Sequence, residues 1–178
     1  MSVPEMGYAE PVRPKDLRRS IDAGQSTQSL DGTLLLERRS MSQEQQIAAF
    51  RKVVEQAYSR GDLAVLDEVF AADFVEHQAG IVPPNLDGVK GSITALRSAF
   101  PDLTLTVEDI IAGGDRTWAR LTGRGTHSGP FMGLPPTGRS FAITVIDICR
   151  FSDGKIAEHW GVADQLALMV QIGALPRP

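Results

Sequence analysis

The stretch Phe141-Ala-Ile-Thr-Val-Ile-Asp-Ile-Cys-Arg-Phe151 places apolar side chains at every second position, and Ser152-Asp-Gly-Lys155 follows it directly. A period of two is typical of a β-strand with one buried face. The Asp-Gly pair predicts a turn, and Ile156 to Val162 then returns as a second strand. This part of the chain therefore predicts an antiparallel β-hairpin.

Two further strands are predicted on the N-terminal side of the hairpin. Leu103 to Asp109 also alternates with period two, Gly113-Gly-Asp115 makes a turn, and Thr117 to His127 returns as a strand. A broad loop rich in proline and glycine then leads to Phe141. Together these segments predict an antiparallel meander of four strands.

Helices are predicted before and after this meander in the sequence. Ser42 and Gln45 form a capping box before a helix that runs to Gly61. The other expected elements are a short helix capped by Asp62, an extended piece at 74–77, a helix whose apolar face runs from Val89 to Phe100, and a last helix over 164–171 with Gly173 as C-cap.

Helices followed by an antiparallel meander predict an α+β domain in which helices cover one face of the sheet. Such a sheet twists and curls, so helices on its concave face leave a conical cavity. Residues 1–40 mix prolines, glycines and charges with little periodicity and are predicted to be a poorly packed extension. We therefore expect one domain over residues 41–178.

Composition narrows the class of protein. Apolar residues make up 42% of the 178 residues, charged residues 22%, and the net charge is -4. The only groupings of basic residues are short pairs, which disfavours nucleic acid as a partner. The sequence contains no run of about 18 apolar residues, so it predicts no membrane helix. Cys149 is the single cysteine, which excludes an internal disulfide. These features predict a cytoplasmic location.

Asp147 is the one charged residue in the inward row of its predicted strand. His159 lies on the next strand among small neighbours, and the turn brings it near Asp147 on the same face. A buried carboxylate beside an imidazole is typical of acid–base catalysis. The alternative is a structural carboxylate that pairs with an arginine or with the backbone.

Other side chains are candidates for the rim or wall of the cavity. Tyr58 could contribute a hydroxyl, Trp118 could contact an aromatic ligand, and Arg120 could hold an oxyanion or pair with Asp147. Trp118 and Arg120 could equally lie on the outer face. His127 and His77 end strands and either rim the cavity or bond turn carbonyls, and Asp164 is better explained as a helix N-cap.

Metal or cofactor binding has little support in the sequence. The three histidines are widely spread, the cysteine is alone, and neither an H-E-x-x-H motif nor a nucleotide-binding glycine motif occurs. The sequence predicts cofactor-free chemistry or simple binding.

Three segments carry a resemblance to a known family: Phe74-Val-Glu-His77, Gly125-Thr-His-Ser-Gly-Pro-Phe-Met-Gly-Leu-Pro-Pro-Thr-Gly138, and Asp153-Gly-Lys-Ile156 running into Glu158-His-Trp160. Over about residues 42 to 175 the chain resembles the SnoaL-like polyketide cyclases, or ester cyclases. The resemblance implies the cone-shaped fold of nuclear transport factor 2. It also implies intramolecular aldol ring closure of an aromatic polyketide ester without metal or cofactor.

By this resemblance, Tyr58, Asp147 and Gly161 fall at positions that face the pocket. The family places its catalytic aspartate directly after the residue matching Trp160, where this chain has Gly161. Where the family has a pocket histidine, this chain has Asp147. Either the carboxylate has moved across the hairpin to Asp147, with His159 orienting it or sharing the proton as a second catalytic residue, or the aldol chemistry is absent.

Three functional hypotheses follow from the sequence. The first is a polyketide cyclase that uses Asp147 and His159 on a small hydrophobic or aromatic ligand. The second is a non-catalytic small-molecule binder in which Asp147 and Arg120 form a structural pair. The third is a cofactor-independent hydroxylase or an isomerase. Apolar residues on the outer sheet face, including Ile146, predict a homodimer or homotetramer.

Overall fold

A computed structural model describes residues 41–176. The predicted N-terminal extension, residues 1–40, lies outside the described residues, so its division from the domain stays a prediction. The described residues contain one sheet of five strands in the order β1-β5-β4-β3-β2. Its strands are β1 (Phe70–Glu76), β2 (Thr104–Gly113), β3 (Arg116–Thr126), β4 (Ser140–Ser152) and β5 (Lys155–Ala163).

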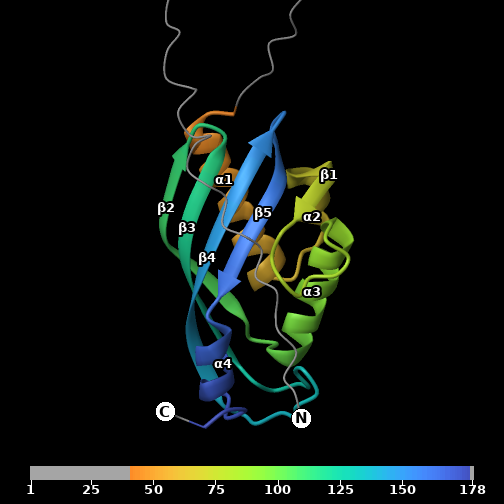
Figure 1. Cartoon of the computed structure of the whole chain (residues 1–178), viewed down its shortest axis with the longest axis vertical. Coiled ribbons are helices and arrows are strands. Elements are labelled where there is room, and N and C mark those ends of the chain that lie inside the picture. Colours follow the sequence, from red (N-terminus) through yellow and green to blue (C-terminus); the bar gives the residue numbers. More distant parts are fainter. Residues whose placement is uncertain (1–40, 177–178) are drawn as a thin grey trace, which may run out of the picture. The chain divides into compact units, whose positions relative to one another are not determined.

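The helices confirm the predicted α+β class. They are α1 (Gln43–Lys52), the π-helix η2 (Val53–Ser59), α2 (Ala64–Val69), α3 (Leu86–Ala99) and α4 (Gln165–Gln171). Figure 1 shows α1, α2 and α3 on one side of the curved sheet and α4 directly after β5. The capping box of α1 is present, since the backbone N–H of Gln45 donates to Ser42 Oγ and that of Ser42 donates to Gln45 Oε1.

The prediction of a four-stranded meander was incomplete, because β1 joins the sheet as a fifth strand. It pairs in parallel with β5, and Glu76 lies opposite His159 in this pairing. Parallel partners are joined by a long connection instead of a tight turn. In this chain nearly 80 residues separate β1 from β5, so no local pattern revealed the pairing. The extra strand brings Glu76 beside His159.

The β4–β5 hairpin forms through the predicted turn. Ser152 pairs with Lys155, a bulge lies between Arg150 and Phe151, and Asp147 is directly opposite Gly161. His159 is opposite Cys149, and it is therefore a diagonal neighbour of Asp147 on the same sheet face. Diagonal neighbours lie about 7–8 Å apart at the backbone, within reach of long side chains. The predicted approach of Asp147 to His159 is thus confirmed.

The proline and glycine loop between β3 and β4 folds against the end of α3. The backbone N–H groups of Ser128 and Gly129 both donate to the carbonyl oxygen of Ala99. A Cβ atom on Gly129 would lie 2.1 Å from the carbonyl oxygen of Ser98, so only glycine permits this approach. The loop thereby positions Phe131 and Met132 at the cavity.

No helix within residues 41–176 is both long and apolar enough to span a bilayer.

Candidate active site

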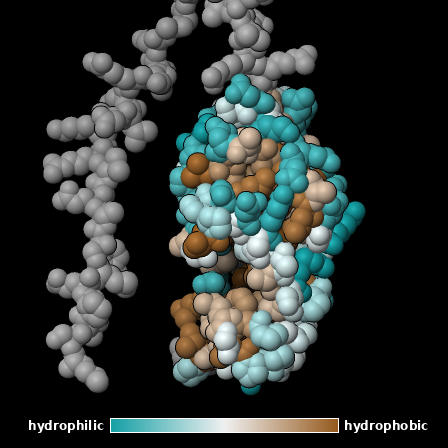
Figure 2. Space-filling model, turned by 90° about the vertical axis from the view of Figure 1, so that its right-hand side faces the viewer, coloured by the Kyte–Doolittle hydropathy of each residue, from teal (hydrophilic) through white to brown (hydrophobic). Residues whose placement is uncertain are grey.

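A cavity of about 520 Å³ lies between the sheet, α3, the end of η2 and the loop that follows β1. Viewed from the side of α2 and α3, the surface is hollowed near its middle, with apolar side chains beside and below the opening (Figure 2). Most of the lining is apolar. The lining side chains that carry polar groups come from Tyr58, Gln78, Ser92, Asp147 and Gln165.

Asp147 is the only carboxylate among the described residues that line this cavity. Its side chain is 14% exposed, and Oδ1 lies 3.4 Å from His159 Nε2. This histidine is the one protein group to which the Asp147 side chain is paired among the described residues. Much of the capacity of the carboxylate to accept a proton or hydrogen bond therefore remains available to a ligand.

His159 is held from its other side by Glu76. Its Nδ1 atom lies 3.0 Å from Glu76 Oε1 and 2.9 Å from Oε2, and the Glu76 side chain is 1% exposed. Both ring nitrogens of His159 thus face a carboxylate. Only the doubly protonated ring offers an N–H to each of them, so the arrangement favours the imidazolium form.

The pKa of His159 reflects these contacts. Burial alone lowers it, but the hydrogen bonds to Asp147 and Glu76 and the charges of both carboxylates outweigh that effect and raise the pKa to about 10. The ring therefore carries a positive charge at neutral pH and acts as a fixed cation between two anions. A buried charge is tolerated when it is paired and hydrogen-bonded in this way.

Tyr58 lines the cavity as predicted. It lies in the π-helix η2, a form of helix that is rare and frequent at functional sites. Burial raises the pKa of Tyr58 above its ordinary value, and the nearby charges of Asp147, Glu76 and Cys149 raise it further. The hydroxyl therefore keeps its proton and can serve as a hydrogen-bond donor to a ligand.

Gly161, which the resemblance places at the pocket, is absent from the cavity lining, which corrects that expectation. A Cβ atom at this position would lie 2.2 Å from Gln78 Oε1 and 2.9 Å from His159 Cε1. The amide of Gln78, a cavity-lining residue, therefore occupies the space in front of Gly161.

Trp118 and Arg120 do not line the cavity, which corrects the prediction that they could wall it. They alternate with the buried Thr117, Ala119 and Leu121 along β3 and so point to the outer face of the sheet. Arg120 Nε donates to Asp109 Oδ2 over 2.8 Å. The suggested pairing of Arg120 with Asp147 is therefore wrong. The hypothesis that Asp147 and Arg120 form a structural pair is wrong for the same reason.

The two other histidines also lie away from the cavity lining. His77 stacks on Trp160 with ring centroids 4.5 Å apart, and its Nε2 contacts Glu158 Oε2 at 2.8 Å. His127 is fully buried, with Nδ1 3.1 Å from Thr137 Oγ1. Neither ring lines the cavity: Trp160 and Glu158 hold the His77 ring, whereas the His127 ring is buried with its Nε2 atom lacking a hydrogen-bond partner among the described residues.

Asp164 is the N-cap of α4, and its Oδ1 accepts from the backbone N–H of Ala167 over 2.9 Å. It is absent from the cavity lining, whereas its neighbours Ala163 and Gln165 belong to it. The capping interpretation is confirmed, and the expectation of a pocket position is not met.

Sequence reasoning missed Glu76 and Gln78. A signal for Glu76 was present, since Phe74 and Glu76 occupy alternate positions of β1 and both are buried. This pattern of a lone charge in an apolar row is the one that identified Asp147. Gln78 gave no comparable signal, because it lies in a loop.

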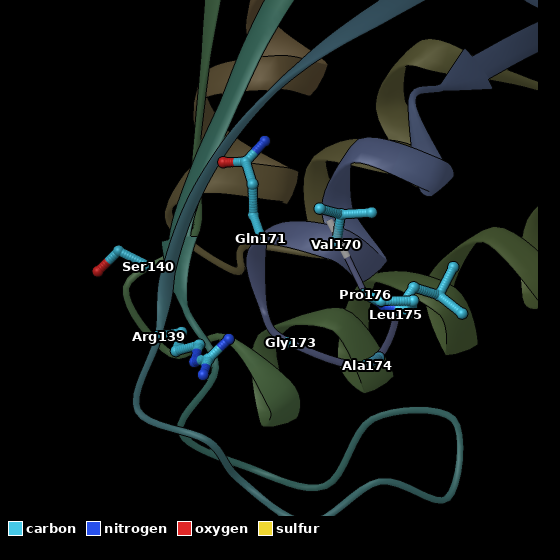
Figure 3. Close-up of a pocket in the computed structure, with 8 residues that line it drawn as sticks. All are labelled: Arg139, Ser140, Val170, Gln171, Gly173, Ala174, Leu175 and Pro176. Carbon is cyan, nitrogen blue, oxygen red and sulfur yellow. The ribbon is translucent and has the colours of Figure 1, made fainter. Parts of the chain in front are cut away.

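A second hollow, of about 830 Å³, opens between the start of β4 and the C-terminal segment. Figure 3 shows Arg139, Gln171 and Gly173 among its lining residues. The amide of Gln171 is bonded to both backbone polar groups of Ala142. None of the lining residues is a carboxylate or a histidine, so this hollow lacks the acid–base groups of the central cavity.

Within residues 41–176, no group of three or more histidine, cysteine or acidic side chains is arranged to hold a metal ion. Cys149 is buried, and burial, followed by the charges of Asp147 and Glu76, raises its pKa well above the ordinary value. A thiol in this state is a poor nucleophile. The chemistry of the site therefore centres on Asp147, with His159 and Glu76 behind it.

The described residues thus form an apolar cavity with one carboxylate on its wall, on a curved sheet covered by helices. The family model described as SnoaL-like polyketide cyclase matches residues 48–172. This chain belongs to the SnoaL-like polyketide cyclase family, and its fold is the cone-shaped one that the resemblance predicted.

Individual relatives agree with this assignment. The chain is 33% identical over 135 residues to aklanonic acid methyl ester cyclase DauD from Streptomyces sp. (strain C5), covering 72% of this chain and 81% of that protein. The crystal structure of IdmH from Streptomyces antibioticus, a suggested polyketide cyclase, has 38% identity and a TM-score of 0.66, covering 72% of this chain and 99% of that one. AclR from Streptomyces galilaeus, a suggested hydroxylase, has 35% identity and a TM-score of 0.69, covering 77% and 86%.

Proposed function

We propose that this protein closes a ring in an aromatic polyketide ester by intramolecular aldol addition, with Asp147 as the catalytic base. One observation carries the proposal: the carboxylate of Asp147 faces an apolar cavity and is held from behind by His159, which Glu76 holds in turn. The relatives named as methyl ester cyclases support the substrate class.

The proposed steps balance without any added reactant. Asp147 accepts the proton of a carbon between a ketone and an ester carbonyl, and the C–H electron pair moves into the carbonyl system as an enolate. The enolate carbon then forms a bond to a second carbonyl carbon of the same molecule, and the C=O π pair moves to that oxygen. The resulting alkoxide takes the proton back from Asp147, so the product is an isomer of the substrate.

The fixed charge of His159 has a defined part in this reaction. A cation that stays protonated at neutral pH, with its pKa raised to about 10, keeps Asp147 oriented toward the cavity. It does not itself exchange a proton with the ligand, because its two N–H groups face carboxylates. His159 is therefore a positioning residue, and Asp147 is the group that contacts the reacting carbon.

Incubation of the purified protein with aklanonic acid methyl ester tests the proposal. We expect a cyclised product with the same mass as the substrate and no uptake of oxygen. A product that has gained oxygen, with consumption of O2, would instead support the hydroxylase that the similarity to AclR raises. Binding of the ester with no conversion would support the non-catalytic alternative.

We also propose that the outer sheet face mediates self-association. Ile111, Trp118, Ile146 and Val162 are exposed large apolar residues, with exposed fractions of 66%, 39%, 41% and 69%. Contiguous exposed apolar surface commonly marks an interface. Light scattering coupled to gel filtration should give at least twice the monomer mass for the wild type and a lower mass for Ile146→Asp. A wild-type monomer at micromolar concentration would exclude this assembly.

The predicted cytoplasmic location stays a prediction.

A further inference from the structure

Gln78 is the residue that takes the place left free by Gly161. Gly161 is the direct cross-strand partner of Asp147. Because Gln78 Oε1 lies 2.2 Å from the position of a Cβ atom on Gly161, the amide lies over the Asp147–Gly161 pair, on the sheet face that carries His159. A ligand atom near Asp147 is therefore also near this amide.

The backbone of Gln78 is fixed by the residues that hold His159. Its N–H donates to Glu76 Oε1 over 2.7 Å, and the N–H of the preceding His77 donates to the carbonyl oxygen of His159 over 2.9 Å. The loop after β1 is thus tied to β5 at the level of the site. These bonds use only backbone donors of Gln78 and His77, so they survive a change of side chain at position 78.

The side-chain amide of Gln78, in contrast, makes no hydrogen bond to any described residue. An amide offers two N–H donors and a carbonyl acceptor. The other polar side chains that line the cavity are those of Tyr58, Ser92 and Gln165. A polar group left without a protein partner at a ligand cavity is suited to bond the ligand.

We propose that Gln78 binds the substrate and donates a hydrogen bond from its amide to the carbonyl oxygen that becomes the enolate oxygen when Asp147 removes the adjacent proton. This inference rests on the proposed function. The donated bond strengthens as negative charge develops on that oxygen, so it favours the transition state over the bound substrate. Gly161 is required because any side chain there would displace the amide.

Gln78→Ala and Gln78→Glu test the role. Glutamate keeps the size of the side chain but, when ionised, only accepts hydrogen bonds. Both variants should lower kcat for aklanonic acid methyl ester roughly 100-fold or more, as loss of one oxyanion donor does, with KM changed by less than about tenfold. The melting temperature should stay that of the wild type, and Gln43→Ala, which removes an exposed amide from α1, should leave turnover unchanged. Turnover of Gln78→Ala within threefold of wild type would overturn the inference, as would parallel loss of turnover and folding in both variants.

Gly161→Ala provides an independent test through a double-mutant cycle. If its Cβ acts by displacing the amide, then Gly161→Ala should lose about as much kcat as Gln78→Ala, and the double variant should be no slower than either. Multiplicative losses would mean that the methyl group acts through His159 instead, and the inference would fail.

The two proposals fail separately. Loss of turnover in Asp147→Asn with normal turnover in Gln78→Ala would leave the function standing and remove the role of Gln78. Normal turnover in Asp147→Asn with loss of kcat in Gln78→Ala would remove the proposed base and keep Gln78 as the donor to the enolate oxygen.

Discussion

Replacement of Asp147 by Asn should lower kcat for ring closure roughly 10²- to 10⁴-fold, the usual contribution of a positioned general base. The amide has nearly the size of the carboxylate, so the cavity keeps its shape and KM should change by only a few-fold. A mutation that lowers kcat and kcat/KM equally removes an interaction made in the transition state. Steady-state kinetics with aklanonic acid methyl ester measures both quantities.

Asp109→Asn is the matched control for this experiment. Asp109 is also a strand carboxylate paired with a cation, but its partner Arg120 lies on the outer sheet face. Its replacement should leave kcat unchanged. If Asp147→Asn lost binding and turnover to the same degree, or kept wild-type turnover, Asp147 would not be the base.

Replacement of Glu76 by Gln should have the largest effect on stability. It removes one of two carboxylates from a buried charged histidine, and breaking a buried pair in this way typically costs about 3–5 kcal/mol. For a domain of this size such a loss lowers the melting temperature by roughly 10–20 °C. Glu158→Gln is the control, since it removes the carboxylate of the more exposed His77–Glu158 pair and should shift the melting temperature by only a few degrees.

The stability of the wild type should also depend on pH through His159. The pKa of this residue is about 10 in the folded protein, against an ordinary value of 6.5. A raised pKa stabilises the fold fully below pH 6.5, and the contribution is lost as pH rises through 10, by about 1.4 kcal/mol per pH unit in between. Glu76→Gln lowers the pKa of His159 in the folded state, so its unfolding free energy should fall less steeply over this range. Chemical denaturation at pH 6, 8 and 10 compares the slopes, and equal slopes would contradict the role assigned to Glu76.

Local sequence patterns predicted the parts of the site that lie on adjacent strands. The period-two row of β4 identified Asp147, and the turn at Asp153-Gly154 brought it to His159. Both inferences rest on interactions between neighbours in the chain. The family resemblance then supplied the substrate class and the curved cone, which periodicity alone only suggested.

The residues that were missed or misplaced depend on long-range contacts. Glu76 reaches His159 only because β1 pairs in parallel with β5, and Gln78 reaches Gly161 through the loop that follows. The sequence did not determine whether Trp118 lies on the inner or the outer face of the sheet. Because Ala119 and Leu121 in the alternate row of β3 are buried, Trp118 lies on the outer face. For such positions the fold of distant segments, and not the local pattern, determines the surroundings.

The orientation of Asp147 depends most on the charge state of His159, which nuclear magnetic resonance of the labelled imidazole measures directly. We expect both ring nitrogens of His159 to be protonated between pH 6 and pH 9, with a titration midpoint near the pKa of about 10. A midpoint near the ordinary value of 6.5, or a ring with one protonated nitrogen at pH 8, would contradict a cation fixed between Asp147 and Glu76.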